Sequence, residues 1–148
     1  MFNNMRFLIN LCLLITVIQL SIARSEELTK ENALAAANEC KDETGATDDD
    51  IAAILEHKPA DSTEGKCLRS CVMKKFGIMN DDGKLVKEKA LEVAQVMIAD
   101  EDKKDLAIEV VEACENLSVN VDHCEAAVEY GACLKEHANE KGLLPPDF

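Results

Sequence analysis

Cysteine is the residue type in this sequence with the richest chemistry, and two cysteines lie close together in residues 64–79, EGKCLRSCVMKKFGIM. Cys67 and Cys71 are four residues apart, so in a helix they share one face with Cβ atoms about 5–6 Å apart. A disulfide needs Cβ atoms about 3.5–4.5 Å apart. The two sulfurs should therefore not bond each other within a regular helix, and each must find a partner elsewhere.

The N-terminus predicts the redox compartment in which these cysteines reside. Arg6 precedes an apolar run over residues 7–20, and Ser21 and Ala23 supply small residues at a cleavage site. This pattern predicts a secretory signal peptide at residues 1–23. A membrane anchor is the alternative, but the run is shorter than the roughly 20 apolar residues that a span requires. We therefore expect secretion, without stable membrane insertion.

Removal of residues 1–23 also removes Cys12, which turns seven cysteines into six. An even number in an oxidising compartment favours three disulfides, and six cysteines allow fifteen pairings. Cys124 and Cys133 would lie about 13–14 Å apart along one helix axis, so they should not pair. This exclusion and that of Cys67–Cys71 leave ten pairings open.

Metal binding is the competing chemistry. His123 beside Cys124 could join other cysteines around zinc, but zinc ligand pairs usually have tighter spacing and a secreted chain favours oxidation. Residues 80–83, Asn-Asp-Asp-Gly, predict a turn and lack the ligand spacing and closing glutamate of a calcium loop. We therefore expect no metal and no cofactor.

The elements that must position the cysteines are helices, and a strand interpretation has almost no support. Residues 24–148 have the length of one domain. Their charge is strongly acidic, because loss of Arg6 moves the formal value from −13 to −14. This charge favours solubility and argues against nucleic acid as a partner. The expected helices cover about 28–44, 51–58, 64–76, 84–99, 100–116 and 122–141. Thr47, with acids at 48–50 in the first turn, and Ser62 are expected to cap the second and third helices, and Gly77 to end the third.

Two of these helices have a predicted inward face, set by apolar residues three and four apart. The face of the fifth helix is predicted to comprise Leu106, Val110, Ala113, Cys114 and Leu117. The face of the last helix is predicted to comprise Cys124, Ala127, Val128, Gly131, Leu134 and Ala138.

The cysteine spacing Cys40-x26-Cys67-x3-Cys71-x42-Cys114-x9-Cys124-x8-Cys133 resembles that of the insect odorant-binding proteins, in their general or pheromone-binding six-cysteine branch. The stretches GKCLRSCVMKKFGI and DHCEAAVEYGACL look similar to members of that family as well. The resemblance implies an all-α fold, a compact bundle of six helices around an apolar cavity. It also implies three interlocked disulfides, Cys40–Cys71, Cys67–Cys124 and Cys114–Cys133, a set that lies within the ten.

The resemblance further implies a secreted carrier of small hydrophobic molecules, such as odorants or pheromones. It would carry them through extracellular fluid, such as sensillar lymph, to olfactory receptors, and a homodimer is left open. An enzyme is not expected, because all six cysteines would be bonded and Asp122-His123 is an isolated pair. The alternative is a secreted helical interaction or signalling module without a small-molecule ligand.

Apolar faces supply the candidate cavity wall, with plain core packing as the alternative for each residue. Tyr130 could offer a directional contact to an alcohol or carbonyl, or its hydroxyl could face water. The candidates are Ile51, Leu55, Met73, Phe76, Leu91, Ala94, Met97, Ile98, Val110, Val111, Tyr130, Leu134 and Phe148.

Three further features carry expectations. The apolar tail at 143–148 is expected to act as a lid rather than a helix. His57, His123 and His137 could make ligand release sensitive to acid, although solvated histidines are the more frequent case. The glycosylation sequon at 116–118, Asn-Leu-Ser, is interpreted as unused, because Leu117 is expected to face inward.

Overall fold

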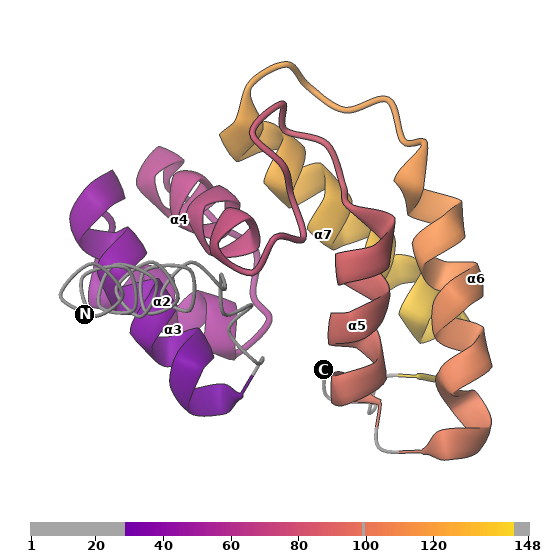
Figure 1. Ribbon diagram of the computed structural model, residues 1–148. Helices are drawn as coiled ribbons and strands as arrows, with labels where there is room; N and C mark the ends of the chain where they lie inside the picture. The colour runs from indigo at the N-terminus through magenta and orange to yellow at the C-terminus, as the bar shows by residue number, and fades with distance from the viewer. Residues whose placement is uncertain (1–28, 99, 144–148) are drawn as a thin grey trace, which may run out of the picture.

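The computed structural model describes residues 29–98 and 100–143, and over these residues the fold is all-α (Figure 1). Six α-helices and one short 3-10 helix are present among these residues, so the predicted fold class and number of helices are confirmed. The predicted signal peptide and most of the C-terminal tail lie outside the described residues. The elements are α2 (Lys30–Thr44), α3 (Asp48–Leu55), α4 (Thr63–Lys75), α5 (Lys87–Met97), η1 (Glu101–Lys103), α6 (Lys104–Glu115) and α7 (His123–Glu140).

Polar side chains define where most of these helices begin. Thr47 and Asp50 form a reciprocal capping box at the start of α3. The Ser62 hydroxyl accepts a hydrogen bond from the backbone N–H of Gly65, and Asp122 caps α7 in the same way. Each cap satisfies a backbone donor that the helix itself leaves unpaired. These caps explain why α3, α4 and α7 start within a residue of Thr47, Ser62 and Asp122.

Several helix boundaries differ from the prediction by three or four residues. Helix α6 begins at Lys104 instead of residue 100, because residues 101–103 form the 3-10 helix η1. Helix α3 ends at Leu55 instead of residue 58, because His57 adopts a left-handed conformation with φ of 54°. Helix α5 begins at Lys87 instead of residue 84, because Met79 and Leu85 form an antiparallel bridge around the predicted turn. Long-range pairing overrides helical periodicity there.

The predicted inward faces of α6 and α7 are partly wrong. On α6 the buried residues are Ala107, Val110, Val111 and Cys114, while Ala113 and Leu117 are exposed. Leu117 lies beyond the end of α6, so helical spacing no longer determines its direction. On α7, Gly131 is exposed and its neighbour Tyr130 is buried instead. Glycine has no side chain to bury, so its position indicates only weakly which face of the helix points inward.

Helix α4 is the central element of the arrangement. It packs against α2 and α3 on one side and α7 on the other, while α6 packs against α5 and α7. Among the described residues, no Cα atom of α2 or α3 lies within 8 Å of a Cα atom of α5, α6 or α7. Figure 1 shows this division, with α2 and α3 on one side of α4 and α5 and α6 on the other.

The buried residues form two hydrophobic clusters instead of one continuous core. The first surrounds Tyr130 and is built mainly from α5, α6 and α7. The second surrounds Leu68 and is built from α2, α3 and α4. Domains of ordinary size usually contain one contiguous core. The division therefore distinguishes this interior from that of a conventional helical bundle.

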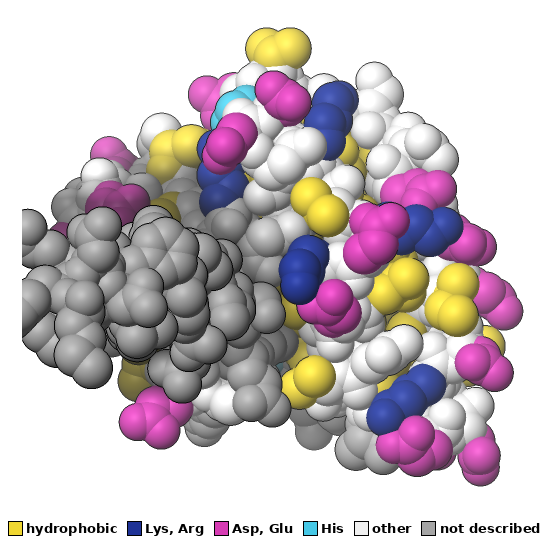
Figure 2. All heavy atoms as spheres, in the orientation of Figure 1, with side chains coloured by type: hydrophobic (Ala, Val, Ile, Leu, Met, Phe, Trp, Pro, Cys, Tyr) yellow, Lys and Arg dark blue, Asp and Glu magenta, His cyan; other side chains and the backbone are white. Residues whose placement is uncertain are grey.

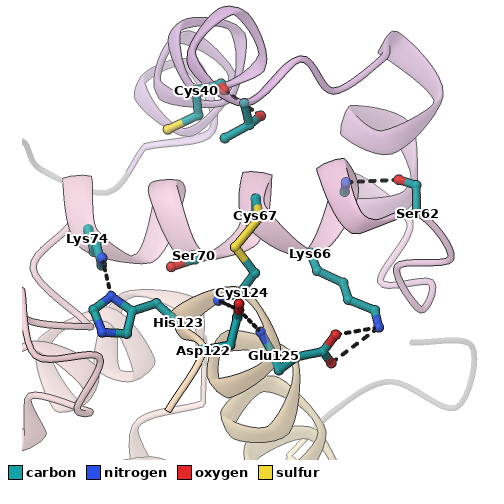
Figure 3. Close-up of a disulfide and its surroundings, with 12 residues drawn as sticks. Cys40, Ser62, Lys66, Cys67, Ser70, Lys74, Asp122, His123, Cys124 and Glu125 are labelled. Carbon is teal, nitrogen blue, oxygen red and sulfur yellow. Dashed lines mark hydrogen bonds and ion pairs between the residues drawn. A yellow bond between two sulfur atoms is a disulfide. The ribbon is translucent and has the colours of Figure 1, made fainter. Parts of the chain in front are cut away.

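Three disulfides connect the helices, and one of them, Cys67–Cys124, crosses this division. Cys40–Cys71 joins α2 to α4, Cys67–Cys124 joins α4 to α7, and Cys114–Cys133 joins α6 to α7. These are the three pairings that the family resemblance implies. The two cysteines of α4 therefore bond in opposite directions, Cys71 to α2 and Cys67 to α7. Figure 3 shows the second of these bonds, Cys67–Cys124. No helix within the described residues is long and apolar enough to cross a membrane.

Candidate functional site

Tyr130, in the middle of α7, is the polar group at the centre of the first hydrophobic cluster. Its exposed fraction is 0%, and its hydroxyl has no hydrogen-bond partner among the described residues. An unsatisfied buried polar group costs about 1–3 kcal/mol. Such groups are rare in folded proteins, and each one calls for a specific explanation.

The surroundings of Tyr130 are almost entirely aliphatic. Ala126 and Ala127 precede it on α7, and Val111 approaches from α6. Several apolar side chains pack against this cluster while remaining partly accessible, and they are Met73, Ile78, Leu91, Val119, Cys133 and Leu134. These residues therefore surround the Tyr130 hydroxyl with an apolar environment.

The structure brings some of the predicted wall residues together and separates others. Met73, Leu91, Val111, Tyr130 and Leu134 share the first cluster, whereas Ile51 belongs to the second. Phe76 and Val110 are buried outside both clusters, and Ala94 and Ile98 are partly buried.

Two predicted wall residues are not buried at all. Leu55 is 43% exposed and Met97 is 54% exposed. Both lie at the C-terminal ends of their helices, α3 and α5, where fewer neighbours can cover a side chain. Their contact with a ligand stays a prediction. Phe148 lies outside the described residues.

Sequence reasoning missed several residues at the centre of the two clusters. Met79 and Leu85 reach the first cluster through their antiparallel bridge, a contact that no helical pattern could predict. Leu68 is fully buried in the second cluster, directly after Cys67. The run Ala126, Ala127, Tyr130 has helical spacing, and this signal could have identified the buried face of α7.

Polar contacts fasten α4 to the start of α7 around the Cys67–Cys124 disulfide (Figure 3). Lys66 Nζ lies 2.9 Å from Oε1 of Glu125. Lys74 Nζ lies 2.8 Å from Nδ1 of His123, and since an ammonium group can only donate, that ring nitrogen accepts. These contacts hold the N-terminal end of α7, and with it Tyr130, against α4.

The connection between α3 and α4 is held by two cations. Arg69 of α4 donates a hydrogen bond to the carbonyl of Lys58, and Lys135 Nζ of α7 lies 3.0 Å from the carbonyl oxygen of His57. Burial lowers the pKa of His57, and the positive charges of Lys135 and Arg69 lower it further. Burial also lowers the pKa of Arg69. The neutral form of His57 is therefore favoured in the folded protein.

The other two histidines have different surroundings. His123 faces Lys74, as described above, and His137 Nδ1 lies 3.0 Å from Oε2 of Glu140. The hypothesis of acid-sensitive ligand release through the three histidines stays a prediction.

One cluster of potential metal ligands occurs among the described residues, Cys114, Cys133 and His137. Both cysteines are bonded to each other, so their sulfurs are not thiolates and cannot ligate as such. The cluster is a disulfide with a nearby histidine.

The surface carries the acidic charge of the sequence. Figure 2 shows Asp and Glu side chains spread over the face formed by α5 and α6, with hydrophobic side chains between them. Many of these acids pair with lysines, as Lys87 does with Glu112 and Glu115. Such exposed pairs add little stability. The charge therefore serves chiefly to keep the molecule in solution.

Within the described residues, six α-helices fastened by three disulfides around an aliphatic interior with one unsatisfied hydroxyl define a disulfide-stabilised helical binding protein. A family model described as the PBP/GOBP family matches residues 23–137. The chain belongs to that family of odorant-binding proteins, and it is a non-enzymatic, secreted carrier of small hydrophobic ligands.

Two similar proteins, and the solved structure of one of them, support this assignment. The chain is 47% identical over 119 residues to general odorant-binding protein 19d of Drosophila melanogaster, covering 80% of this chain and 79% of the relative. It is 37% identical over 137 residues to general odorant-binding protein 28a of the same fly, covering 89% and 96%. The solved structure of that fly's odorant-binding protein OBP28a aligns with a TM-score of 0.71 at 41% identity, covering 76% of this chain and 93% of that one.

Proposed function

We propose that this chain carries a small, mainly aliphatic molecule with one oxygen acceptor, held in an internal cavity between the two hydrophobic clusters. The hydroxyl of Tyr130 donates the one directed hydrogen bond to that oxygen. Odorants and pheromones that are alcohols, aldehydes or esters fit this description.

The single observation that carries the proposal is the unsatisfied Tyr130 hydroxyl. It is fully buried and has no partner among the described residues. A ligand oxygen that accepts its proton would remove the cost of leaving it unpaired. The hydroxyl would then discriminate between an oxygenated ligand and a hydrocarbon of the same length.

The partly buried residues around Tyr130 support an apolar binding surface. Met73, Leu91 and Leu134 pack against the first cluster without being fully covered. Burial of their remaining surface against a ligand would be favourable by about 25 cal/mol per Å² of apolar area. Met73 can also adapt its shape to different ligands, because methionine has a flexible side chain.

The division of the core supports a cavity between α2–α4 and α5–α7. The two clusters are separate, and α2 and α3 do not approach α5 or α6. Loose packing costs stability. The disulfides can offset that cost, because each constrains the unfolded chain. Leu55 and Met97, both exposed, are proposed to lie at the entrance, with the tail that includes Phe148 as a lid.

A buried apolar binding site is suited to the transport of hydrophobic molecules through water. An apolar odorant dissolves poorly in water, whereas an acidic protein that encloses it remains soluble. We propose that the chain works in sensillar lymph and delivers its ligand to a membrane-bound olfactory receptor. The relatives named as general odorant-binding proteins support this role. One chain per ligand suffices, so the homodimer left open by the sequence is not required.

The test is displacement of a fluorescent apolar probe from the wild type and Tyr130→Phe by three ligands of equal chain length, a primary alcohol, an aldehyde and an alkane. A net hydrogen bond is worth about 0.5–1.5 kcal/mol, so the wild type should bind the oxygenated ligands about two- to tenfold more tightly than the alkane. Tyr130→Phe should bind the oxygenated ligands no more tightly than the alkane, because their oxygen would be buried without a donor. It should retain the wild-type affinity for the alkane.

Two outcomes contradict the proposal. If the probe and ligands do not bind the wild type, the chain acts as an interaction or signalling module, the alternative that the sequence left open. If the ligands bind but Tyr130→Phe keeps the preference for oxygen, the directed contact comes from another residue. Leu34→Ala, an exposed site on α2, serves as the matched control and should leave every affinity unchanged.

A further inference from the structure

The loop between α6 and α7 carries a modification site that ligand binding does not explain. Residues 116–118 read Asn-Leu-Ser, which is the only Asn-X-Ser/Thr sequon in the sequence. Such a sequon accepts an N-linked glycan when it lies on the surface of a secreted protein. We propose that Asn116 of the secreted chain is N-glycosylated.

The first support is the exposure of the whole sequon. Asn116, Leu117 and Ser118 are all exposed, with Leu117 at 36%. The sequence-based interpretation that the sequon is unused rested on Leu117 facing inward, and that orientation is wrong. Leu117 follows the end of α6, where its backbone N–H still bonds the carbonyl of Cys114 but its side chain has left the helical face.

The second support is the freedom of the acceptor amide. Asn116 caps the C-terminal end of α6, and its Nδ2 has one hydrogen bond, 3.3 Å long, to Oε1 of the partly buried Glu115. A weak contact on the surface costs little to lose. Attachment of a sugar at Nδ2 therefore requires no rearrangement of the fold.

The third support is the way in which the rest of the loop is anchored. Val119 packs against the first hydrophobic cluster, and the backbone N–H of Asn120 bonds Oε2 of Glu129 at 2.9 Å. These contacts tie down the loop directly after the sequon and leave residues 116–118 on the outside. A glycan at Asn116 would extend into solvent.

The site is also remote from the proposed cavity entrance. Asn116 stands at one end of α6, while Lys103, just before the other end, bonds the carbonyl of Gly142 at 3.0 Å. The intervening helix of 12 residues is about 18 Å long. Figure 1 places the α6–α7 loop and the C-terminal end of α7 at opposite ends of α6. A glycan would therefore not obstruct ligand entry.

The chemistry is a glycosyl transfer in the secretory pathway. The co-reactant is an oligosaccharide linked to a polyprenyl diphosphate. The Nδ2 atom of Asn116 attacks the anomeric carbon of the first N-acetylglucosamine, so a C–N bond forms and the bond from that carbon to the diphosphate oxygen breaks. The lipid diphosphate leaves with the bonding electron pair, and the amide releases one proton. The transferase recognises the hydroxyl group of Ser118 in the sequon.

The experiment is expression of the full chain in insect cells that secrete it, followed by mass spectrometry of the peptide containing Asn116. The wild type should carry a mass increase composed of hexose and N-acetylhexosamine units. Enzymatic release of the glycan should convert Asn116 to Asp. Ser118→Ala should lose the modification, whereas Ser118→Thr and the neighbouring control Asn120→Gln should keep it.

Two results would overturn the proposal. One is a secreted wild type with three intact disulfides and an unmodified Asn116. The other is modification of Ser118→Thr alone, since the natural sequon would then be accessible but unused. The proposal is independent of the ligand, because unglycosylated Ser118→Ala should bind the apolar probe as the wild type does. If one Ser118 variant is not secreted, the glycosylation state of Asn116 in the wild type and in Asn120→Gln still tests the proposal.

Discussion

At the scale of single residues, two glycines lie in opposite surroundings and should respond oppositely to alanine. Gly131 is in the middle of α7, and a Cβ atom there would meet nothing within 4 Å. Gly83 has a φ of 73°, and a Cβ atom there would lie 2.5 Å from Cδ2 of His123. Space and backbone conformation therefore both favour alanine at Gly131 and disfavour it at Gly83.

We expect Gly131→Ala to raise the free energy of unfolding by about 0.5–1 kcal/mol, because glycine is a poor helix former. We expect Gly83→Ala to lower it by about 1–3 kcal/mol, because alanine is strained at positive φ. Denaturant unfolding of the two variants beside the wild type measures both changes. A destabilising Gly131→Ala would show that α7 is not regular around Tyr130.

His57 gives the fold a dependence on pH whose sign follows from its surroundings. Burial and the charges of Lys135 and Arg69 lower its pKa below the ordinary 6.5 in the folded state. The unfolded chain therefore binds more protons than the folded chain between the two pKa values. Stability is then complete above pH 6.5 and is lost as the pH falls through the lower, folded pKa.

The variant His57→Asn should show a smaller loss of melting temperature between pH 7.5 and pH 5 than the wild type. Asparagine tolerates the left-handed backbone of this position and does not titrate. His137→Asn, at an exposed position near the end of α7, controls for the general effect of removing a histidine. An unchanged pH dependence in His57→Asn would contradict the assignment.

At the scale of the elements, the disulfides differ in how much chain each one closes. Cys67–Cys124 joins residues 57 apart, whereas Cys114–Cys133 joins residues 19 apart. On the chain-entropy model, the longer loop contributes about 4 kcal/mol and the shorter one about 3 kcal/mol. Only the longer loop connects α4, and through it the second cluster, to α7.

The double variant Cys67→Ala/Cys124→Ala should therefore lose more stability than Cys114→Ala/Cys133→Ala. Unfolding in guanidinium chloride, monitored by circular dichroism, gives both values under identical conditions. A larger loss in Cys114→Ala/Cys133→Ala would mean that the disulfide between α6 and α7 contributes more stability than the disulfide that closes the long loop.

Local signals in the sequence predicted most of the elements. The N-caps at Thr47 and Ser62 mark the starts of α3 and α4. The positive φ of Gly77 marks the end of α4. Contacts between distant residues were beyond this reasoning. The Met79–Leu85 bridge shortened α5, and the exposed Leu117 followed the early end of α6. Neither the bridge nor the exposure of Leu117 can be predicted from the local periodicity of apolar residues.

The candidate site was predictable only in part for the same reason. Tyr130 was singled out as the one tyrosine, and it is buried without a partner. Its neighbours Met79 and Leu85 come from a loop whose path is set by tertiary contacts. The disulfide pairing followed from family resemblance, because helix geometry alone left ten arrangements.

At the scale of the whole molecule, the described residues form two buried clusters joined by α4, α7 and three disulfides. If the proposed cavity lies between these clusters, a ligand that fills it should stabilise the fold. At a free ligand concentration of 100 times Kd, one site adds about 2.7 kcal/mol to the free energy of unfolding. Thermal unfolding with and without a long-chain alcohol measures this gain, and an unchanged melting temperature at saturation would contradict it.

The most direct test of the central claim uses Tyr130 itself as the probe. The sequence contains one tyrosine and no tryptophan, so near-ultraviolet absorption in that band reports on this one phenol. Titration with an alcohol should shift the band to the red and saturate at one ligand per chain, because the hydroxyl becomes a hydrogen-bond donor, while an alkane of equal length should bind with a smaller shift. If the alcohol binds at saturation and the band of Tyr130 does not move, the claim that this hydroxyl contacts the ligand is wrong.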